Sequence, residues 1–312
     1  MTTTSTDQSG ARGVLFAAAA YAIWGLFPLY FKQLQQVSAA EIVVHRALWC
    51  MLLLLAVLGA LKRWGWLAEL RQQPRVLLGF AASAALLGVN WLIYIWAVNN
   101  GRVLDASLGY FINPLVNVLL GTLVLHERLR PAQWCAIALA AMGVVWMTLS
   151  AGALPWVALS LAVSFGLYGL LRKTAALGPL EGLTLETAFA APLALGAVLW
   201  WVSQGSLDVG LTAAPGRSGH EHTMLWVWLL LSGPMTALPL LLFAAGARRI
   251  RMSTLGLLQY IAPSLQFLLG WGLYHETLSS GRLVGFACIW TALLVYSAEH
   301  LWRERRSLAA AR

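Results

Sequence analysis

The chain contains 312 residues, of which 60% are hydrophobic and 11% are charged, and its formal net charge is +9. Because soluble domains carry about 25% charged residues, this composition nearly excludes a soluble enzyme. The stretches 49–61 and 225–231 are almost continuously apolar, whereas a transmembrane barrel alternates apolar and polar residues. The sequence therefore predicts an all-α polytopic membrane protein embedded in a lipid bilayer.

The predicted elements begin after a polar, Thr-rich tail, residues 1–12. No small-residue cleavage site follows it, so we expect a retained tail and not a signal peptide. About 20 apolar residues cross roughly 30 Å of hydrocarbon. By that measure ten transmembrane helices are expected, at residues 14–34, 42–61, 76–98, 104–125, 132–149, 154–171, 182–202, 224–247, 253–274 and 283–301.

Basic residues in the connections predict the orientation of these helices. Of the 21 Lys and Arg residues, sixteen lie in the N-tail, the even-numbered loops and the C-tail, four lie in the other loops, and Arg46 lies inside a span. By the positive-inside rule, both termini are expected in the cytoplasm, in a multi-pass protein of the cell inner (plasma) membrane. The charges occupy short gaps between apolar segments and form no basic face, so no nucleic-acid partner is expected.

The two halves of the chain resemble each other. Ten residues are identical between 102–129 and 251–278 at an offset of 149 positions, and Glu41 faces Glu181 at an offset of 140. Each half contains five expected spans, an odd number, so the second half must enter the membrane from the opposite side. We therefore expect two inverted five-helix repeats, at 13–150 and 151–302, followed by a basic cytoplasmic tail at 303–312.

Three strings of residues resemble a known transporter family. They are EIVVHRALW at 41–49, SLGYFINPLVN at 107–117 and STLGLLQYIAP at 253–263. They are similar to RarD proteins, a branch of the drug/metabolite transporter superfamily with two EamA repeats, and the likeness runs from residue 13 to residue 302. The resemblance implies a secondary transporter in the metabolite, amino-acid or drug-export range, with a cavity lined by spans one, three, four, six, eight and nine.

The same resemblance points to one Glu in each half. EamA repeats have a helix-end Glu, which corresponds here to Glu127 and Glu276. Family members usually carry a small residue before that Glu, whereas this chain has His126 and His275. The resemblance therefore extends to the glutamates and not to the histidines.

Two charged residues inside expected spans are candidates for coupling or gating. The repeat relates Arg46 in the second span to Glu186 in the seventh. Burying such a charge costs about 2.5 to 3.5 kcal/mol, so an ionisable residue within a membrane indicates function by default. The alternative is that each side chain snorkels to its nearer headgroup region. Because they enter from opposite faces of a core about 30 Å thick, no direct ion pair between them is expected. Glu41 and His45 are one turn apart and could form a local pair near the outer surface. We expect instead that they belong to a polar outer rim.

Uncharged polar and aromatic residues at mid-depth are candidates for solute binding. Amides and phenols can hydrogen-bond a polar solute without the penalty of a permanent charge, and aromatic faces can stack on it. The alternative role is interhelical hydrogen bonding, worth about 0.6 kcal/mol per bond in membranes. The candidates are Trp24 in the first expected span, Asn90 and Tyr94 in the third, Tyr110 and Asn113 in the fourth, and Gln259 and Tyr260 in the ninth.

Two pairs of repeat-related residues in the fourth and ninth spans are further candidates for gating. Pro114 and Pro263 are expected near the middle of their helices, where each removes a backbone hydrogen bond and favours a hinge. Glu127 and Glu276 close the same helices, although a carboxylate at that end opposes the helix dipole. A gate ion pair, proton binding or simple solvation in a loop would each account for these glutamates.

The sequence contains no pattern for catalysis, for a cofactor or for a metal site. His126-Glu127 and His275-Glu276 lack the second His of H-E-x-x-H, and no nucleophile elbow or phosphate-binding loop occurs. His220-Glu221-His222 is typical of an outer loop. We therefore predict no enzyme but a secondary transporter, a permease or exporter, that moves a small polar or amphipathic metabolite or drug by alternating access. A channel or a non-transporting membrane subunit is the alternative, followed by a membrane-embedded enzyme, and no pattern indicates an oligomeric state.

Overall fold

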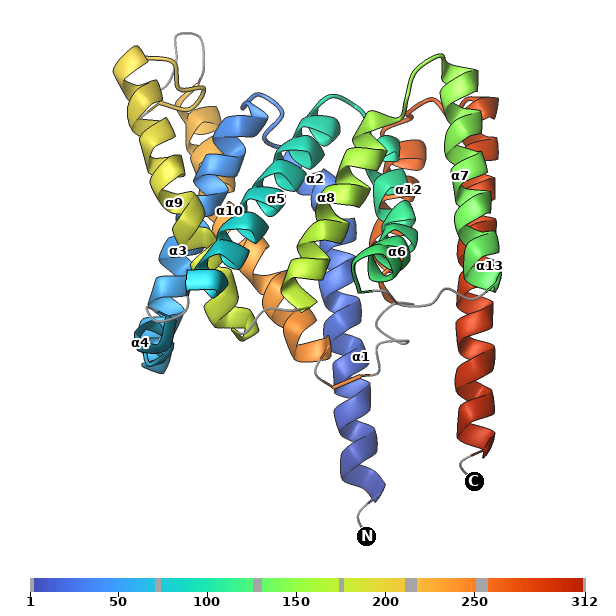
Figure 1. The fold of residues 1–312 in the computed structure, drawn as a ribbon. Helices are drawn as coiled ribbons and strands as arrows, with labels where there is room; N and C mark the ends of the chain where they lie inside the picture. The colour runs from blue at the N-terminus through green and yellow to red at the C-terminus, as the bar shows by residue number, and fades with distance from the viewer. Residues whose placement is uncertain are drawn as a thin grey trace.

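The structure is a computed structural model that describes residues 3–70, 74–125, 131–173, 177–210, 218–247, 249–250 and 258–310. Within these ranges all regular secondary structure is helical (Figure 1). The elements are α1 (Thr3–Gly25), α2 (Phe27–Lys32), α3 (Ala39–Leu61), α4 (Trp66–Leu70), α5 (Pro74–Asn99), α6 (Val103–Leu125), α7 (Pro131–Ala151), α8 (Trp156–Lys173), α9 (Pro179–Gln204), α10 (Gly219–Ala247), α12 (Ile261–Leu268), the π-helix η1 (Leu269–Leu273) and α13 (Ser280–Ala310).

The helices of the described ranges include eight that are long and apolar enough to cross a membrane. Two shorter apolar segments, Trp156–Arg172 and Ile261–Leu273, bring the set to about ten spans. The predicted all-α polytopic fold is therefore confirmed. The N- and C-terminal ends of the chain lie on the same side of the bundle (Figure 1), as an even number of crossings requires.

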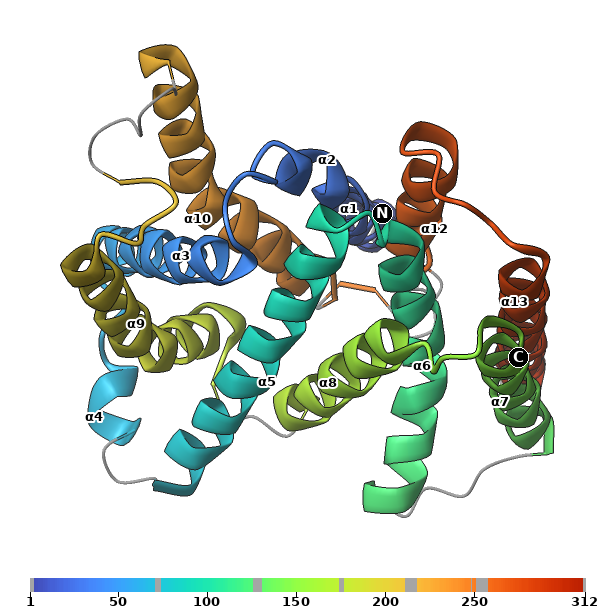
Figure 2. The same cartoon turned by 90° about the horizontal axis from the view of Figure 1, so that it is seen from above.

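The helices pack in a pattern that the two halves of the chain share. α3 contacts α9, α6 contacts α12 and α7 contacts α13, so these helices of the first half each meet their counterpart from the second half. Other contacts also occur twice, once in each direction between the halves. α1 packs on α10, and their counterparts α8 and α5 pack on each other. In the same way α3 packs on α10, and α9 packs on α5. Seen from above, α3 and α9 lie at one end of the bundle and α7 with α13 at the other (Figure 2). This pattern agrees with the inverted repeat that the sequence predicts.

Two of the expected spans are less regular than the hydropathy pattern suggests. The first span consists of α1 and α2, which meet at Leu26. In the ninth, α12 begins at Ile261, so Pro263 is only its third residue, where a missing N–H removes no helical hydrogen bond. Pro114, in contrast, lies inside α6. The expected mid-helix position is therefore found for Pro114 and not for Pro263.

Glycine allows two helix pairs to approach closely in the middle of the bundle. A Cβ atom at Gly233 of α10 would lie 2.7 Å from the carbonyl oxygen of Trp49 in α3. A Cβ atom at Gly109 of α6 would lie 2.7 Å from the carbonyl oxygen of Ala158 in α8. The first of these approaches lies one turn of α3 from Arg46, and it positions the site described next.

Candidate functional site

Arg46 of α3 is buried inside the helix bundle. Only 7% of its surface is exposed, and its Nε donates a hydrogen bond of 2.6 Å to Thr236 Oγ1 of α10. Its Cζ lies 3.4 Å from the centroid of the Trp91 ring of α5, where the ring quadrupole attracts a cation. The side chain therefore lies between α5 and α10 and does not snorkel to a headgroup region.

Helices from both halves of the chain surround this guanidinium. The phenols of Tyr30, Tyr110 and Tyr168, from α2, α6 and α8, lie within electrostatic range of Arg46. Among the described residues no carboxylate forms an ion pair with Arg46, and its hydrogen-bond partner Thr236 is neutral. Arg46 is therefore a buried positive charge for which the described chain supplies no counter-charge.

Glu186 of α9, the repeat-related residue, is also buried, but it has a counter-charge. It is 2% exposed, and its Oε1 accepts a hydrogen bond of 2.6 Å from Ser83 Oγ of α5. The same oxygen lies 3.7 Å from Arg172 Nη1 of α8, which supplies the counter-charge. Arg46 and Glu186 thus have separate partners and, in the described structure, form no ion pair with each other, as their predicted depths require.

The amides predicted to bind solute form a hydrogen-bonded network between helices. Asn90 Nδ2 donates to the carbonyl oxygen of Leu161 and to Ser164 Oγ, both on α8. Asn113 Nδ2 donates to the carbonyl oxygen of Ala162, and Asn113 Oδ1 accepts from Gln259 Nε2 at 3.2 Å. These are interhelical hydrogen bonds, the alternative role for such amides. Solute binding by Asn90 and Asn113 therefore stays a prediction.

The four aromatic candidates lie in three regions. Tyr110 donates to Asn90 Oδ1 at 3.2 Å, and its ring lies 5.8 Å from that of the buried Tyr94, so these two belong to the Arg46 surroundings. Trp24 packs against Tyr21 and Phe243, with the three rings within 6 Å of one another. Tyr260 lines a separate apolar cavity of about 550 Å³ between α6, α12 and α13.

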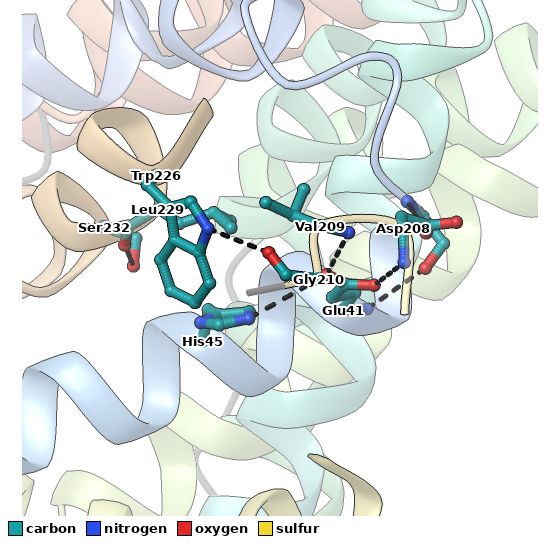
Figure 3. Close-up of polar contacts among 9 residues, drawn as sticks. Glu41, His45, Asp208, Val209, Gly210, Trp226, Leu229 and Ser232 are labelled. Atoms are coloured by element: carbon teal, nitrogen blue, oxygen red, sulfur yellow. Dashed lines mark hydrogen bonds and ion pairs between the residues drawn. The ribbon is translucent and has the colours of Figure 1, made fainter. Parts of the chain in front are cut away.

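A second cluster of contacts joins the start of α3 to the loop before α10, and so joins the two halves of the chain (Figure 3). Glu41, at the start of α3, is 2% exposed and accepts hydrogen bonds from the backbone N–H groups of Asp208 and Val209 at 2.8 and 3.0 Å. Asp208 Oδ2 in turn accepts from the backbone N–H of Ser38 at 2.7 Å. His45 Nε2 lies 3.9 Å from Glu41 Oε1. Glu41 is therefore buried and binds the loop before α10, and the expectation of a polar rim is wrong for it.

Glu276, in the connection between η1 and α13, makes a similar contact with the start of α6. The start of α6 and that connection lie at the face opposite the chain termini (Figure 1). Its carboxylate accepts from the backbone N–H groups of Val103 and Leu104 at 2.6 and 2.9 Å, where the first turn of α6 attracts negative charge. Arg282 and Asp105 add an ion pair of 3.2 Å across the same junction. Burial raises the pKa of Glu276, while the N–H groups of Leu104 and Val103 lower it.

One ion pair joins the halves at the other face, where α3 ends and α9 begins (Figure 1). Arg63 Nη2 lies 2.6 Å from Glu181 Oε1, and the Arg63 side chain is 58% exposed. The repeat relates Glu181 to Glu41. Each of these two glutamates therefore contacts the other half of the chain, at opposite faces of the bundle.

The remaining predicted residues lie apart from these clusters. Glu127 lies outside the described residues, so its gating role stays a prediction, as does that of Pro114. Pro263 contributes a carbonyl oxygen that accepts from Ser107 Oγ of α6 at 2.8 Å. Glu221 pairs reciprocally with Ser218 at the start of α10, a capping box. No group of potential metal ligands is present in the described ranges.

Comparison with known proteins identifies the family. An uncharacterized transporter of Pseudomonas aeruginosa is 47% identical over 95% of this chain and 96% of its own. The uncharacterized transporter YojE of Bacillus subtilis is 45% identical over 95% and 97%, and protein RarD of Escherichia coli is 42% identical over 95% and 97%. The EamA-like transporter family model matches residues 11–149. The chain is a RarD-type EamA transporter.

The fold of this RarD-type transporter is also found in a solved structure. A crystal structure that is 19% identical covers 94% of this chain and 98% of its own, with a TM-score of 0.55, and at that identity it shows the fold alone. The family and the apolar helices together establish a multi-pass membrane transporter. Its relatives bear transporter names, which indicates a role other than catalysis.

Sequence reasoning missed several residues of the RarD-type site. Thr236 and Ser83 hold the two buried charges, but isolated hydroxyls in apolar helices are common and bond the preceding turn of their own helix. Arg172 directly follows the expected span 154–171, so the sequence indicates a charge in a loop and not a partner inside the bundle. The match of Glu41 with Glu181 is visible in the repeat and shows that the two positions are equivalent, but it does not show which residues they contact.

Proposed function

We propose that this RarD-type protein is a secondary transporter, a permease or exporter, that moves a small polar or amphipathic metabolite or drug across the cell inner membrane by alternating access. Both termini are then cytoplasmic, as the distribution of basic residues indicates. One observation carries the proposal. Glu41 and Glu181, which the repeat relates, join the two halves of the chain at opposite faces of the bundle. Two such contacts are what an inverted repeat needs to close one face at a time.

The contacts of Glu41 and Glu181 differ in strength. This difference favours a conformation in which one face is closed. Glu41 is buried and accepts two backbone hydrogen bonds, and hydrogen bonds to a charged group are worth about 1.5–3 kcal/mol each. The partner of Glu181, Arg63, is largely exposed, and an exposed ion pair is worth about 0–1 kcal/mol. Glu276 adds two further bonds on the side of Glu41. The face with Glu41 and Glu276, the outer face under the proposed orientation, is the more strongly closed.

The residues between the two faces supply the elements of a transport site. Arg46 contacts α5 and α10, and Glu186 contacts α5 and α8, so each half contributes one buried charge that faces α5. Tyr94, Tyr110 and Trp91 provide aromatic surface beside Arg46. Charge together with aromatic surface favours a solute with a polar group and an apolar body, and Glu186 is the candidate for proton coupling.

Counterflow in liposomes tests the proposal. Liposomes that contain the full-length protein and an unlabelled solute are diluted into a trace of the same solute with a label. The panel includes amino acids and chloramphenicol, because a Pseudomonas aeruginosa relative that is 32% identical bears the name chloramphenicol-sensitive protein RarD. Transient, saturable uptake that depends on the solute inside is expected for at least one compound. Unsaturable flux would indicate a channel, and the absence of flux for the whole panel would contradict transport.

A further inference from the structure

The buried positive charge of Arg46 has no counter-charge in the described structure. The buried charge of its repeat counterpart, Glu186, has one. Glu186 lies beside Arg172 and accepts a hydrogen bond from Ser83. Arg46 has only the neutral Thr236 and the face of Trp91. A buried charge is costly unless it is paired, and a cation–π contact offsets only part of that cost. The described chain therefore leaves one positive charge to be balanced by something that is not part of it.

Four other carboxylates in the described part of the chain already have partners. Glu41 binds the backbone of Asp208 and Val209, Glu276 binds the start of α6, and Glu181 pairs with Arg63. Asp105 pairs with Arg282. None of these can reach Arg46 without breaking a contact between the halves. A rearrangement that brought one of these four carboxylates to Arg46 would therefore leave its present partner without it.

The arrangement around Arg46 leaves its binding groups available. Nε is used by Thr236, while the two terminal Nη groups donate no hydrogen bond to any described residue. The Trp91 ring lies over the guanidinium and restricts its orientation. A planar guanidinium presents parallel N–H donors that match a carboxylate or a phosphate. The phenols of Tyr30, Tyr110 and Tyr168, from three more helices, lie within electrostatic range of Arg46. The hydroxyls of Tyr30 and Tyr110 already donate to the carbonyl oxygen of Trp228 and to Asn90 Oδ1.

We propose that Arg46 binds the anionic group of the transported solute, a carboxylate or a phosphate on a small molecule with an apolar body. The inference rests on the proposed transport function and names the class of its substrate. Arg46 belongs to the first half, and Thr236 and Tyr168 belong to the second. An anion at this position contacts both halves, as a midplane transport site requires.

Binding of matched acids and amides tests the proposal directly. The full-length protein in phosphatidylcholine nanodiscs is titrated calorimetrically with benzoate and benzamide, with indole-3-acetate and indole-3-acetamide, and with phenyl phosphate. The wild type is expected to bind at least one anion and to bind its neutral partner at least tenfold more weakly. Comparison of benzoate with phenyl phosphate distinguishes a carboxylate site from a phosphate site.

Substitution of Arg46 localises the binding. Arg46→Gln is expected to weaken anion binding about 10- to 100-fold, and Arg46→Lys, which keeps the charge without the planar donors, to weaken it less. Arg102→Gln is the matched control, because Arg102 is exposed and lies over Trp96 with 5.4 Å between Cζ and the ring centroid. The unfolding temperature of Arg46→Gln is expected to equal or exceed that of the wild type, because an uncompensated buried charge is removed. If Arg46→Gln does not fold, Arg46→Lys compared with Arg102→Lys decides.

Three results would overturn the anion site: no anion binding by the wild type at millimolar concentrations, equal affinity for acid and amide, or unchanged affinity in the Arg46 variants. Failure of transport itself gives a different result. Arg46-dependent anion binding without counterflow of any solute would contradict the proposed function and leave the anion site intact. Counterflow of a neutral solute that Arg46→Gln does not affect would support the proposed function and contradict the anion site.

Discussion

Glu186 is held by groups from two other helices, Ser83 of α5 and Arg172 of α8. Both groups favour an ionised carboxylate, whereas its burial opposes charge. A carboxylate in such a balance can gain or lose a proton when the helices around it move, because either change alters the free energy of the charged form. Glu186 is thus suited to couple a proton to a rearrangement of α5, α8 and α9.

Glu186→Gln tests this coupling. The amide retains an acceptor for Ser83 but cannot ionise, so solute binding should remain and accumulation driven by a pH gradient should be abolished. The measurement is solute uptake by proteoliposomes with an imposed pH gradient, with Glu221→Gln as the control, since Glu221 is an exposed capping residue of α10. Undiminished pH-driven uptake would leave Glu186 with a structural ion pair to Arg172 and no role in coupling.

The sequence identifies Arg46 and Glu186 because a charge within an apolar segment is rare and costly. It does not identify Thr236, Ser83 or Arg172, because their role depends on which helix faces turn toward each other. Hydropathy sets the length of a span, but not its rotation in the bundle.

At the scale of helices, glycine determines how closely α3 and α10 approach. The backbone of Trp49 in α3 occupies the space that a side chain at Gly233 would need. Their close contact places Thr236 within reach of Arg46. The sequence shows 28 glycines, but it does not show which of them face another helix. Gly233 contacts α3, whereas a Cβ atom at Gly196 of α9 would have no neighbour within 4 Å.

Gly233→Ala is therefore expected to destabilise the protein, since one methyl group must force the two backbones apart, and overpacking costs about 1–3 kcal/mol. The measurement is the thermal unfolding midpoint of the purified protein in detergent. Gly196→Ala is the matched control and should leave the midpoint unchanged or raise it, because alanine is favoured over glycine in a helix by about 0.5–1 kcal/mol. Equal midpoints for the two variants would show that the α3–α10 approach does not limit stability.

At the scale of the whole molecule, the two halves contact each other both through equivalent helices and through non-equivalent ones, such as α6 with α8 and α1 with α10. An odd number of spans in each half is enough to predict inversion, and the pairing of α3 with α9 and of α7 with α13 agrees with it. The contacts between the halves were not predictable in the same way. Glu41 binds a loop of the second half through backbone N–H groups, and any residue could supply those groups.

The contacts at the two faces should control access in opposite directions. Glu41→Gln removes the charge from the buried contact and should increase labelling from outside of a cysteine at Tyr110 by about tenfold, the effect of one lost charged hydrogen bond. Glu181→Gln releases the exposed contact with Arg63 and should reduce that labelling by less than about fivefold. The measurement is the rate of modification by a membrane-impermeant thiol reagent, in cells that express the variants without native cysteines. A cysteine at the exposed Ser206 should react at the same rate in both backgrounds and confirms that the loop before α10 is outside. Shifts of the same sign in the two variants would show that Glu41 and Glu181 stabilise the fold and do not act as opposed gates.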